Sequence, residues 1–289
     1  MTILNTYGLT DLNKLTLEDI LGNMVLVLGM TGSGKSNTVA VLVEELLIHN
    51  VPVVIVDPAG EYYGLKEKFT IWEIGKDKDP NRQIDAEISP TGAYHAAQTA
   101  YKNAASTILN VSGFHPKGRA LFVAEFMETV WNLAPHYRFP YVVVLEEAHN
   151  WIPQKGTTAA TEVLVQMSTE GRKWGITVLS SSQRSARLDK DVITQAKLAI
   201  LHFVRHPADL SVYYEIIPRP RSKVKDSISR LGVGEALVLH GAEVQRRTIR
   251  RRHTAHHGHS PTLADLPKER GILTAQQFIQ TILPLELRS

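Results

Sequence analysis

Residues 29–36 constrain the fold of this chain more than any other stretch, because they fill every position of the phosphate-loop pattern G-x-x-x-x-G-K-[ST]. The apolar run 24–28 predicts a buried strand before the loop, and apolar residues at helical spacing over 37–50 predict a helix after it. Glycines let backbone N–H groups turn around phosphate oxygens, and the helix start adds partial positive charge. A chance glycine-rich turn is the alternative, but this order of strand, loop and helix favours a nucleoside triphosphate site.

The polar side chains of this loop have distinct expected roles. Lys35 reaches the β- and γ-phosphates, and the Ser36 hydroxyl binds Mg2+. We therefore predict ATP and Mg2+ as the bound groups. The residues predicted to hold the nucleotide here are Gly29, Thr31, Gly32, Ser33, Gly34, Lys35, Ser36 and Asn37.

The composition excludes several classes of protein. The chain has 289 residues, 43% of them apolar, which is enough for a sizeable core, and it has no cysteine, which excludes disulfides and Cys-based zinc sites. No run approaches the roughly 18–20 apolar residues of a membrane span, and the first residues lack a secretory leader pattern. We therefore expect a cytoplasmic protein without a membrane partner.

Basic residues are unevenly distributed. The formal net charge is only +3, yet arginines and lysines crowd into residues 217–252. This crowding favours a polyanionic partner, and the alternative is a charged, solvated face. The residues concerned are Arg219, Arg221, Lys223, Lys225, Arg230, Arg246, Arg247, Arg250, Arg251 and Arg252.

Strand and helix patterns alternate along the chain, which predicts an α/β fold with a mostly parallel central sheet and flanking helices. Predicted strands cover 24–28, 51–56, 141–145, 175–179 and 199–204. Predicted helices cover 37–50, 93–112, 119–133 and 161–173. In the helix over 119–133, Leu121, Phe122, Phe126 and Val130 are expected to face the core.

The end of the chain predicts a hairpin and then a tail. Segments 235–240 and 244–249 are typical of a C-terminal β-hairpin. We expect one core domain over 1–252, with a helical middle segment at about 90–135, and a tail over 253–289 with a short helix at 274–283. The tail holds a histidine cluster for which a metal site is one interpretation, but without a nearby carboxylate or Cys a flexible tail is favoured. These histidines are His253, His256, His257 and His259.

Two carboxylates follow the apolar strand 141–145. We predict that Glu146 contacts Mg2+ and that Glu147 polarises the attacking water as a general base. A surface Glu pair that ends a strand is the alternative. Gln183 follows the next strand in the same way, so its amide can report the γ-phosphate, unless it is only a loop or capping glutamine.

Three arginines are candidates for stabilising the charge that develops on the γ-phosphoryl group. Arg172 precedes the strand over 175–179 and lies near the sheet end opposite the phosphate loop, so it is poorly placed for its own site. It could, however, reach across a subunit boundary. Arg184 and Arg187 follow Gln183 and lie nearer their own nucleotide. A surface salt bridge is the alternative for each of them.

Four blocks together resemble the HerA/FtsK superfamily of ring-forming DNA-pumping ATPases, on the HerA-like side. They are residues 29–37, 57–62, 145–153, and 170–175 running into 182–184, and with their spacing they cover about residues 20–250. The phosphate loop alone is generic, whereas the Asp-Pro-x-Gly-Glu-Tyr, Glu-Glu-Ala-His-Asn and Gly-Arg-Lys-x-Gly patterns are much more specific.

This resemblance implies a RecA-like ASCE P-loop NTPase core, an ATPase activity, a hexameric ring and translocation of double-stranded DNA through its pore. It implies that Glu147 and Lys35 are catalytic, that Gln183 is the sensor and that Arg172 is the finger supplied to the neighbouring subunit. It also implies that Asp57 and Glu61 lie near the nucleotide, and we add Arg184 to that set.

The chain departs from the family pattern at two points. Glu146 stands where many phosphate-loop NTPases have Asp, and this longer carboxylate still binds Mg2+. The phosphate loop begins at residue 29, so we expect no N-terminal β-barrel before it, which puts a barrel-docked nuclease partner in doubt. The remaining core resembles viral packaging ATPases or plasmid-borne relatives.

The favoured function is an ATP-driven double-stranded DNA translocase, either helicase-like or packaging. The alternative is an ATP-dependent switch or recruitment NTPase that acts with a nuclease or a viral or mobile-element protein, and a small-molecule kinase is a third, weaker hypothesis. A translocase needs cations on its pore loops, for which Lys117, Arg119 and Lys155 are the candidates.

Overall fold

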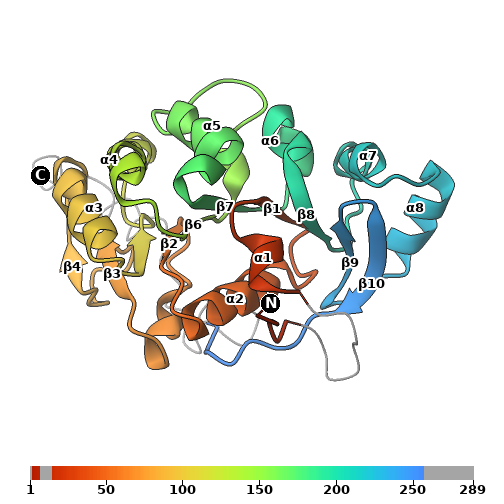
Figure 1. Ribbon diagram of the computed structural model, residues 1–289, viewed down its shortest axis with the longest axis horizontal. Helices are drawn as coiled ribbons and strands as arrows, with labels where there is room; N and C mark the ends of the chain where they lie inside the picture. Colours follow the sequence, from red (N-terminus) through yellow and green to blue (C-terminus); the bar gives the residue numbers. More distant parts are fainter. Residues whose placement is uncertain (1, 7–14, 257–289) are drawn as a thin grey trace, which may run out of the picture. The chain divides into compact units, whose positions relative to one another are not determined.

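Within the described residues, 2–6 and 15–256, the computed structural model is built on one ten-stranded sheet (Figure 1). Its strands lie in the order β10-β9-β8-β1-β7-β6-β2-β5-β3-β4. Their bounds are β1 Met24–Leu28, β2 Val53–Asp57, β3 Trp72–Gly75, β4 Ala86–Glu87, β5 Thr107–Asn110, β6 Tyr141–Leu145, β7 Ile176–Ser182, β8 Ala196–Leu201, β9 Glu235–His240 and β10 Glu243–Thr248.

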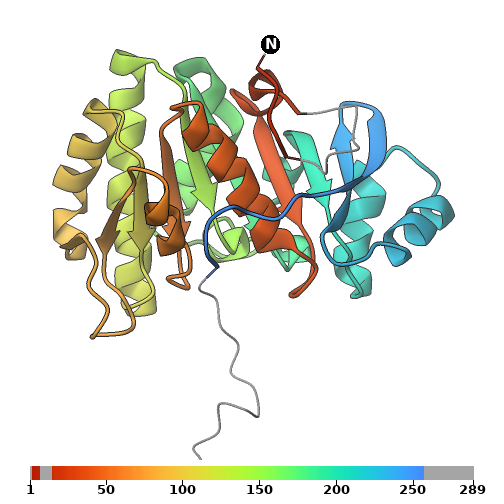
Figure 2. The same cartoon turned by 90° about the horizontal axis from the view of Figure 1, so that it is seen from below.

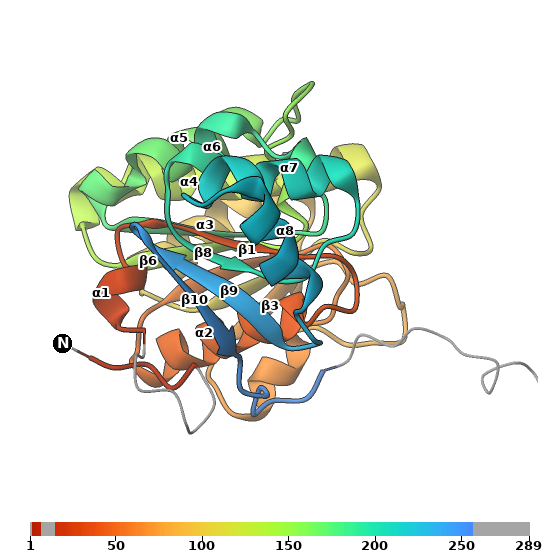
Figure 3. The ribbon, with the colours of Figure 1, turned by 90° about the vertical axis from the view of Figure 1, so that its right-hand side faces the viewer.

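All strand pairs from β8 to β4 in this order are parallel. The antiparallel pairs involve the C-terminal hairpin β9–β10, which lies at one end of the sheet beside α7 (Pro207–Ile216) and α8 (Arg221–Ser229), as Figure 3 shows. Parallel strands have their carboxyl ends at one edge of the sheet, so the loops after β1, β6 and β7 meet there. The predicted α/β fold with its final hairpin is confirmed.

Helices cover both faces of the sheet (Figures 1 and 2). One face carries α1 Leu17–Ile20 and α2 Lys35–Ile48, and the other carries α3 Ala93–Lys102, α4 Pro116–Tyr137, α5 Thr161–Glu170 and α6 Lys190–Thr194. Side chains alternate along β1, so Met24, Leu26 and Leu28 join the core cluster on the α4 side, whereas Val25 and Val27 join the one on the α2 side. The continuous apolar runs of the central strands follow from this burial on two faces.

The predicted helix over 93–112 is wrong in its second half. α3 ends at Lys102, Ala104 adopts a left-handed backbone conformation with a φ of 48°, and residues Thr107–Asn110 form the buried strand β5. The segment after the turn contains Thr107 and Ile108, whose β-branched side chains favour strands. The gain from pairing with both β2 and β3 outweighs the helical spacing of the apolar residues.

The long helix α4 also differs from its prediction. It begins at Pro116, a residue that suits the first turn of a helix, and extends to Tyr137. Phe122, Phe126 and Val130 are buried as predicted, but Leu121 is 55% exposed. Successive residues of a helix are rotated by about 100°, so Leu121, one residue before Phe122, lies just outside the buried stripe.

Several shorter elements were missed or shifted relative to the sequence patterns. The short strands β3 and β4 fall in a segment without clear periodicity, and α6, α7 and α8 carry weak helical patterns. The helix predicted over 161–173 ends at Glu170 and continues as a 3-10 helix over Gly171–Trp174. Strand β7 extends three residues beyond 179, and strand β8 lies three residues earlier than predicted.

The end of the chain leaves two sequence predictions untested. The helix predicted at 274–283 lies outside the described residues, and the division at residue 252 remains a prediction. Among the residues that the structure describes, no helix is long and apolar enough to cross a membrane.

Candidate functional site

The phosphate loop joins β1 to α2 at the carboxyl edge of the sheet. Gly32 and Gly34 have φ angles of 80° and 103°, the left-handed region that favours glycine. A Cβ on Gly34 would lie 2.8 Å from the backbone nitrogen of Gly234, whose N–H donates to the carbonyl of Ser33 at 3.0 Å. The segment that leads into β9 therefore packs against the phosphate loop and hydrogen-bonds to it, a contact that the sequence patterns did not reveal.

His202, directly after β8, is a second support of the phosphate loop. It is fully buried, with Nε2 2.8 Å from the Thr38 hydroxyl and Nδ1 2.9 Å from the carbonyl of Glu235. Burial lowers the pKa of His202 to about 4, so the ring is neutral at pH 7. His202 therefore links β8, β9 and the first turn of α2 as a structural residue.

Lys35 and the two glutamates after β6 come together as the sequence predicts. The Lys35 side chain is 6% exposed, and its Nζ lies 3.9 Å from Glu146 Oε2 and 3.9 Å from Glu147 Oε1. Strand β7 lies between β1 and β6, and its Ser181 hydroxyl is 3.4 Å from Lys35 Nζ. The order of three parallel strands thus juxtaposes a cation and two carboxylates that are more than 100 residues apart in sequence.

Glu146 is held by a hydrogen bond from Tyr62. The Tyr62 hydroxyl donates to Glu146 Oε1, and Trp151 Nε1 donates to the Glu146 carbonyl at 2.8 Å. Tyr62 is itself positioned by Asp57, whose carboxylate accepts the backbone N–H groups of four residues, Ala59, Gly60, Glu61 and Tyr62, at 2.7–3.1 Å. Burial, partly offset by these four bonds, raises the pKa of Asp57 to about 6.

This arrangement gives the 57–62 block a defined part in the site. Asp57 is 1% exposed and its oxygens are occupied by the turn that it organises. Its geometry supports Tyr62 and through it Glu146, and a contact of Asp57 or Glu61 with the nucleotide remains a prediction. Tyr62 was missed in the sequence analysis, although it closes the Asp-Pro-x-Gly-Glu-Tyr pattern.

Glu147 adopts a left-handed backbone conformation, with φ 48° and ψ 50°, at the turn that follows β6. Burial raises the pKa of its carboxyl group, and the Lys35 charge acts in the opposite direction. Its Oε2 lies 3.3 Å from Nδ1 of His149, which is also 3.0 Å from the Ser182 hydroxyl at the end of β7. His149 is a further residue of this site that the sequence analysis did not single out.

Gln183, the predicted sensor, contacts Thr31 of the phosphate loop. The Thr31 hydroxyl donates to Gln183 Oε1. Gln183 directly follows β7, so the same strand carries it and the Ser182 hydroxyl beside His149. Arg184, the next residue, is exposed, and its charge together with those of Arg187 and Lys35 adds to burial in lowering the pKa of His149 to about 4.

Arg172 lies at the opposite edge of the sheet, as its position in the sequence predicts. It is exposed, four residues before β7, and its Cγ would be 3.3 Å from a Cβ on Gly22, which precedes β1. The full length of strands β1 and β7 therefore separates Arg172 from Lys35 of its own chain. Its role in a neighbouring subunit remains a prediction.

Two other predicted residues are engaged elsewhere. The Asn37 side chain donates to the carbonyl of Arg250 at 2.8 Å and accepts from the N–H of Arg252 at 3.0 Å. Arg119 donates to the carbonyls of Ser112 and Phe114, which lie in the segment just before α4. The nucleotide contact of Asn37 and the pore role of Arg119 stay predictions, and both residues already have partners within the fold.

Oxygen ligands suited to Mg2+ are present at the site. The Ser36 hydroxyl and the Glu146 carboxylate are hard donors of the kind that Mg2+ prefers. An open space lies beside Gly32, since no atom is found within 4 Å of a Cβ built there. These residues therefore fit a nucleotide and its metal ion. The described part of the chain, which includes His253 and His256, has no cluster of three or more His, Asp or Glu side chains suited to a metal; His257 and His259 lie outside it.

A phosphate loop, an intervening strand and a glutamate at the end of the next strand define an ASCE-type P-loop NTPase. Residues 13–226 match the family model described as the central domain of helicase HerA, and the chain belongs to this family. The recognition of a HerA-like core from its sequence blocks is thereby confirmed.

Relatives of known description match a shorter region. The chain is 29% identical over 115 residues to the DNA double-strand break repair helicase HerA of Pyrococcus furiosus, covering 40% of this chain and 21% of that protein. It is 29% identical over 117 residues to the probable DNA double-strand break repair helicase HerA of Methanocaldococcus jannaschii, covering 39% of this chain and 23% of that protein. The matched region thus spans about a fifth of these relatives.

Solved structures share the fold. VirB4 of Thermoanaerobacter pseudethanolicus superposes with a TM-score of 0.60 at 13% identity, covering 86% of this chain and 96% of that one. The genome packaging NTPase B204 of Sulfolobus turreted icosahedral virus 2, in complex with ATP-gammaS, gives a TM-score of 0.55 at 17% identity, covering 79% of this chain and 97% of that one. At such identities the likeness establishes the fold alone.

Proposed function

We propose that this protein hydrolyses ATP with Mg2+ and uses the reaction to move double-stranded DNA through a ring of subunits, in the form of a hexamer. The observation that carries the proposal is the convergence of Lys35, Glu146 and Glu147 at the carboxyl edge of the sheet, where Lys35 Nζ lies 3.9 Å from one carboxylate oxygen of each glutamate. A cation, a metal-side carboxylate and a second carboxylate beside a phosphate loop are the groups that ATP hydrolysis needs.

Each side chain has a task in the proposed reaction. Lys35 binds the phosphates, and Ser36 with Glu146 holds Mg2+, which neutralises phosphate charge when bound. Glu147 orients the attacking water and accepts its proton. Gln183, which accepts a hydrogen bond from Thr31 of the phosphate loop, is the proposed sensor of the γ-phosphate.

The position of Arg172 supports a shared site between subunits. Its guanidinium is exposed at the sheet edge opposite the phosphate loop, so it cannot serve its own nucleotide. An arginine supplied in trans stabilises the charge of the transition state and is worth ~10³–10⁵ in rate. In a head-to-tail ring, the edge with Arg172 faces the phosphate loop of the next subunit.

DNA is proposed as the substrate on the basis of the relatives. The matched proteins are named as DNA double-strand break repair helicases, and a protein of similar fold is named as a genome packaging NTPase. A ring that binds the phosphate backbone of DNA needs unpaired cations that contact phosphates and make no base-specific contacts. Lys155, exposed in the loop after β6, meets this condition.

ATP turnover with and without long duplex DNA tests the proposal. We expect Lys35→Ala to abolish nucleotide binding, and Glu147→Gln to retain binding while turnover falls by roughly 10²–10⁴-fold. Glu162→Gln, an exposed glutamate of α5, is the matched control and should keep wild-type turnover. Normal hydrolysis by both site variants would contradict the site, and turnover that DNA leaves unchanged would favour the switch or recruitment NTPase.

Mixing experiments test the shared site. Arg172→Ala and Lys35→Ala proteins should each be inactive, while a mixture should recover part of the wild-type turnover, because some interfaces then combine an intact phosphate loop with an intact arginine. Negative-stain images should contain six-fold rings. Absence of recovery together with a wild-type specific activity that dilution does not lower would remove the support for a trans arginine.

A further inference from the structure

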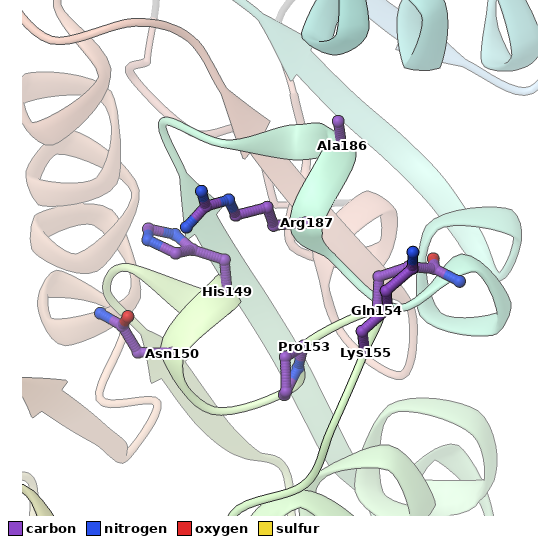
Figure 4. A pocket seen from close by; sticks show the side chains of 7 residues that line it. All are labelled: His149, Asn150, Pro153, Gln154, Lys155, Ala186 and Arg187. Atoms are coloured by element: carbon purple, nitrogen blue, oxygen red, sulfur yellow. The ribbon is translucent and has the colours of Figure 1, made fainter.

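A pocket of about 460 Å³ lies beside the candidate active site, between the loops that follow β6 and β7. Figure 4 shows the side chains that line it; those that matter here are His149, Asn150, Gln154, Lys155 and Arg187. The lining thus offers two cations, two amides and an imidazole, and it includes no carboxylate.

The two loops around the pocket form one unit. Pro153 and Leu188 form an antiparallel bridge, the N–H of Gln154 donates to the carbonyl of Arg187 at 2.7 Å, and the N–H of Asp189 donates to the carbonyl of Ile152 at 3.0 Å. One loop begins at Glu147 and the other at Gln183. A ligand that shifts this bridged unit therefore acts on the proposed general base and on the proposed sensor together.

The cations of the pocket have no partner within the described part of the chain. Lys155 and Arg187 are exposed and neither lies within ion-pair distance of a carboxylate there. The nearby Asp209 already accepts the N–H of Ala186 at 3.0 Å and the Ser185 hydroxyl at 3.2 Å. Unpaired cations and amide donors without a carboxylate are suited to a phosphate group.

His149 connects this pocket to the reaction site. Its Nδ1 lies 3.3 Å from Glu147 Oε2, and that oxygen is buried and accepts no hydrogen bond from the described residues. The guanidinium of Arg187 lies beside the ring in Figure 4, and its charge is among those that act on the imidazole. An imidazole has two ring nitrogens, so one residue can contact Glu147 with Nδ1 and a ligand with Nε2.

We propose that this pocket binds a phosphodiester group of the DNA backbone and that His149 transmits its occupancy to Glu147. The inference rests on the proposed function and specifies how DNA regulates the same site. A phosphate bound by Arg187, whose guanidinium lies beside the ring of His149 in Figure 4, shifts that ring, while Lys155 on the other side of the pocket binds the adjoining part of the backbone. The shift changes the 3.3 Å contact between His149 Nδ1 and Glu147 Oε2, and hence the direction of the carboxylate toward the attacking water. His149 is in this scheme a positioning residue.

The pocket is tested with the double variant Lys155→Ala/Arg187→Ala, with ATP turnover measured over a titration of long duplex DNA. We expect the DNA concentration for half-maximal stimulation to rise at least tenfold, and the steepness with which log K for DNA binding falls against log salt to decrease by about two. The control is Lys68→Ala/Lys102→Ala, which removes two exposed lysines near the starts of β3 and β5. A pocket variant that behaves like this control would overturn the assignment.

The coupling is tested with two substitutions of His149. Asn keeps a polar group near the Nδ1 position but has no Nε2, so His149→Asn should lose less DNA-free turnover than His149→Ala and leave the KM for ATP unchanged, while stimulation by DNA falls below twofold. His149→Ala should lower DNA-free turnover as well, with DNA affinity by fluorescence anisotropy within threefold of wild type. Unchanged stimulation in both variants, or equal loss of DNA-free turnover in both, would overturn the positioning role.

Two further measurements distinguish a failure of the pocket proposal from a failure of the proposed function. Wild-type protein without ATP turnover, or with turnover indifferent to DNA, would contradict the proposed function rather than the pocket. Inorganic phosphate in place of DNA should give no stimulation. Stimulation by phosphate alone that is lost in Lys155→Ala/Arg187→Ala would assign the pocket to free phosphate and overturn its assignment to DNA.

Discussion

Two cation-rich regions of this protein differ in what their charges contact. In the basic segment 217–252, the arginines largely bind their own fold: Arg250 pairs with Glu44 at 2.8 Å and Glu45 at 2.9 Å, and Arg246 pairs with Glu235 at 2.6 Å. In the loops after β6 and β7, by contrast, Lys155 and Arg187 have no ion-pair partner in the described part of the chain. Charge density along the sequence therefore does not identify the cations that are free to bind a polyanion.

The chemistry of the two regions explains the difference. Glu44 is fully buried and accepts hydrogen bonds from Arg250, from the N–H groups of His253 and Thr254 and from the Thr254 hydroxyl at 2.8–3.0 Å. A buried carboxylate needs such donors, so Arg250 is bound for structural reasons. The prediction of a polyanionic partner for this segment accordingly loses Arg250 as a candidate, whereas Arg230, in an exposed pair with Asp226 at 2.9 Å, stays accessible.

The largest effect expected from this comparison is on stability. Arg250→Ala leaves Glu44 and Glu45 buried without their cation, and breaking a buried pair from one side costs about 3–5 kcal/mol. Urea unfolding should show this loss as a lower midpoint. If the loss is below about 1 kcal/mol, the segment is held by its backbone contacts with Asn37 and Glu44 instead.

The pH dependence of the same cluster gives a smaller effect. Burial alone would raise the pKa of Glu44, but the hydrogen bonds from His253, Arg250 and Thr254 hold it below its ordinary value of 4.5. A carboxyl group with a lowered pKa contributes stability above its unfolded pKa and loses it as pH falls through the folded one. The deficit of Glu44→Gln relative to wild type should therefore be full at pH 7 and shrink below about pH 4.5. A deficit that stays constant down to pH 3 would show that the charge of Glu44 is not what matters.

The smallest stability effect is expected in the pocket. Arg187→Ala removes an exposed, unpaired cation and should change the free energy of unfolding by no more than about 0.5 kcal/mol. Its main effect should appear in the response to DNA. Thermal unfolding alongside the DNA titration checks both, and a destabilised Arg187→Ala protein would place this arginine with the structural group of Arg250.

The site was predictable to the extent that it depends on local pattern. The phosphate loop, Glu146, Glu147 and Gln183 each stand at the end of an apolar strand, and parallel strands bring such ends together whatever the intervening sequence. Tyr62, His149 and His202 were missed because each has a partner that is distant in sequence, namely Glu146, the Ser182 hydroxyl and Thr38. Nothing in the spacing of residues specifies such pairs.

By itself, the sequence determined the class of the protein. The phosphate loop needs glycines, which adopt positive φ, between a strand and a helix, and the site needs carboxylates directly after buried strands. Both features are visible in the local order of residues, before any tertiary contact is known. The tertiary structure alone decided that Leu121 faces outward and which cations are paired, and pairing with β2 and β3 decided between helix and strand for 107–110. Pairing and burial depend on neighbours brought together by folding, and the energies of those contacts exceed the local preferences from which the sequence predictions are made.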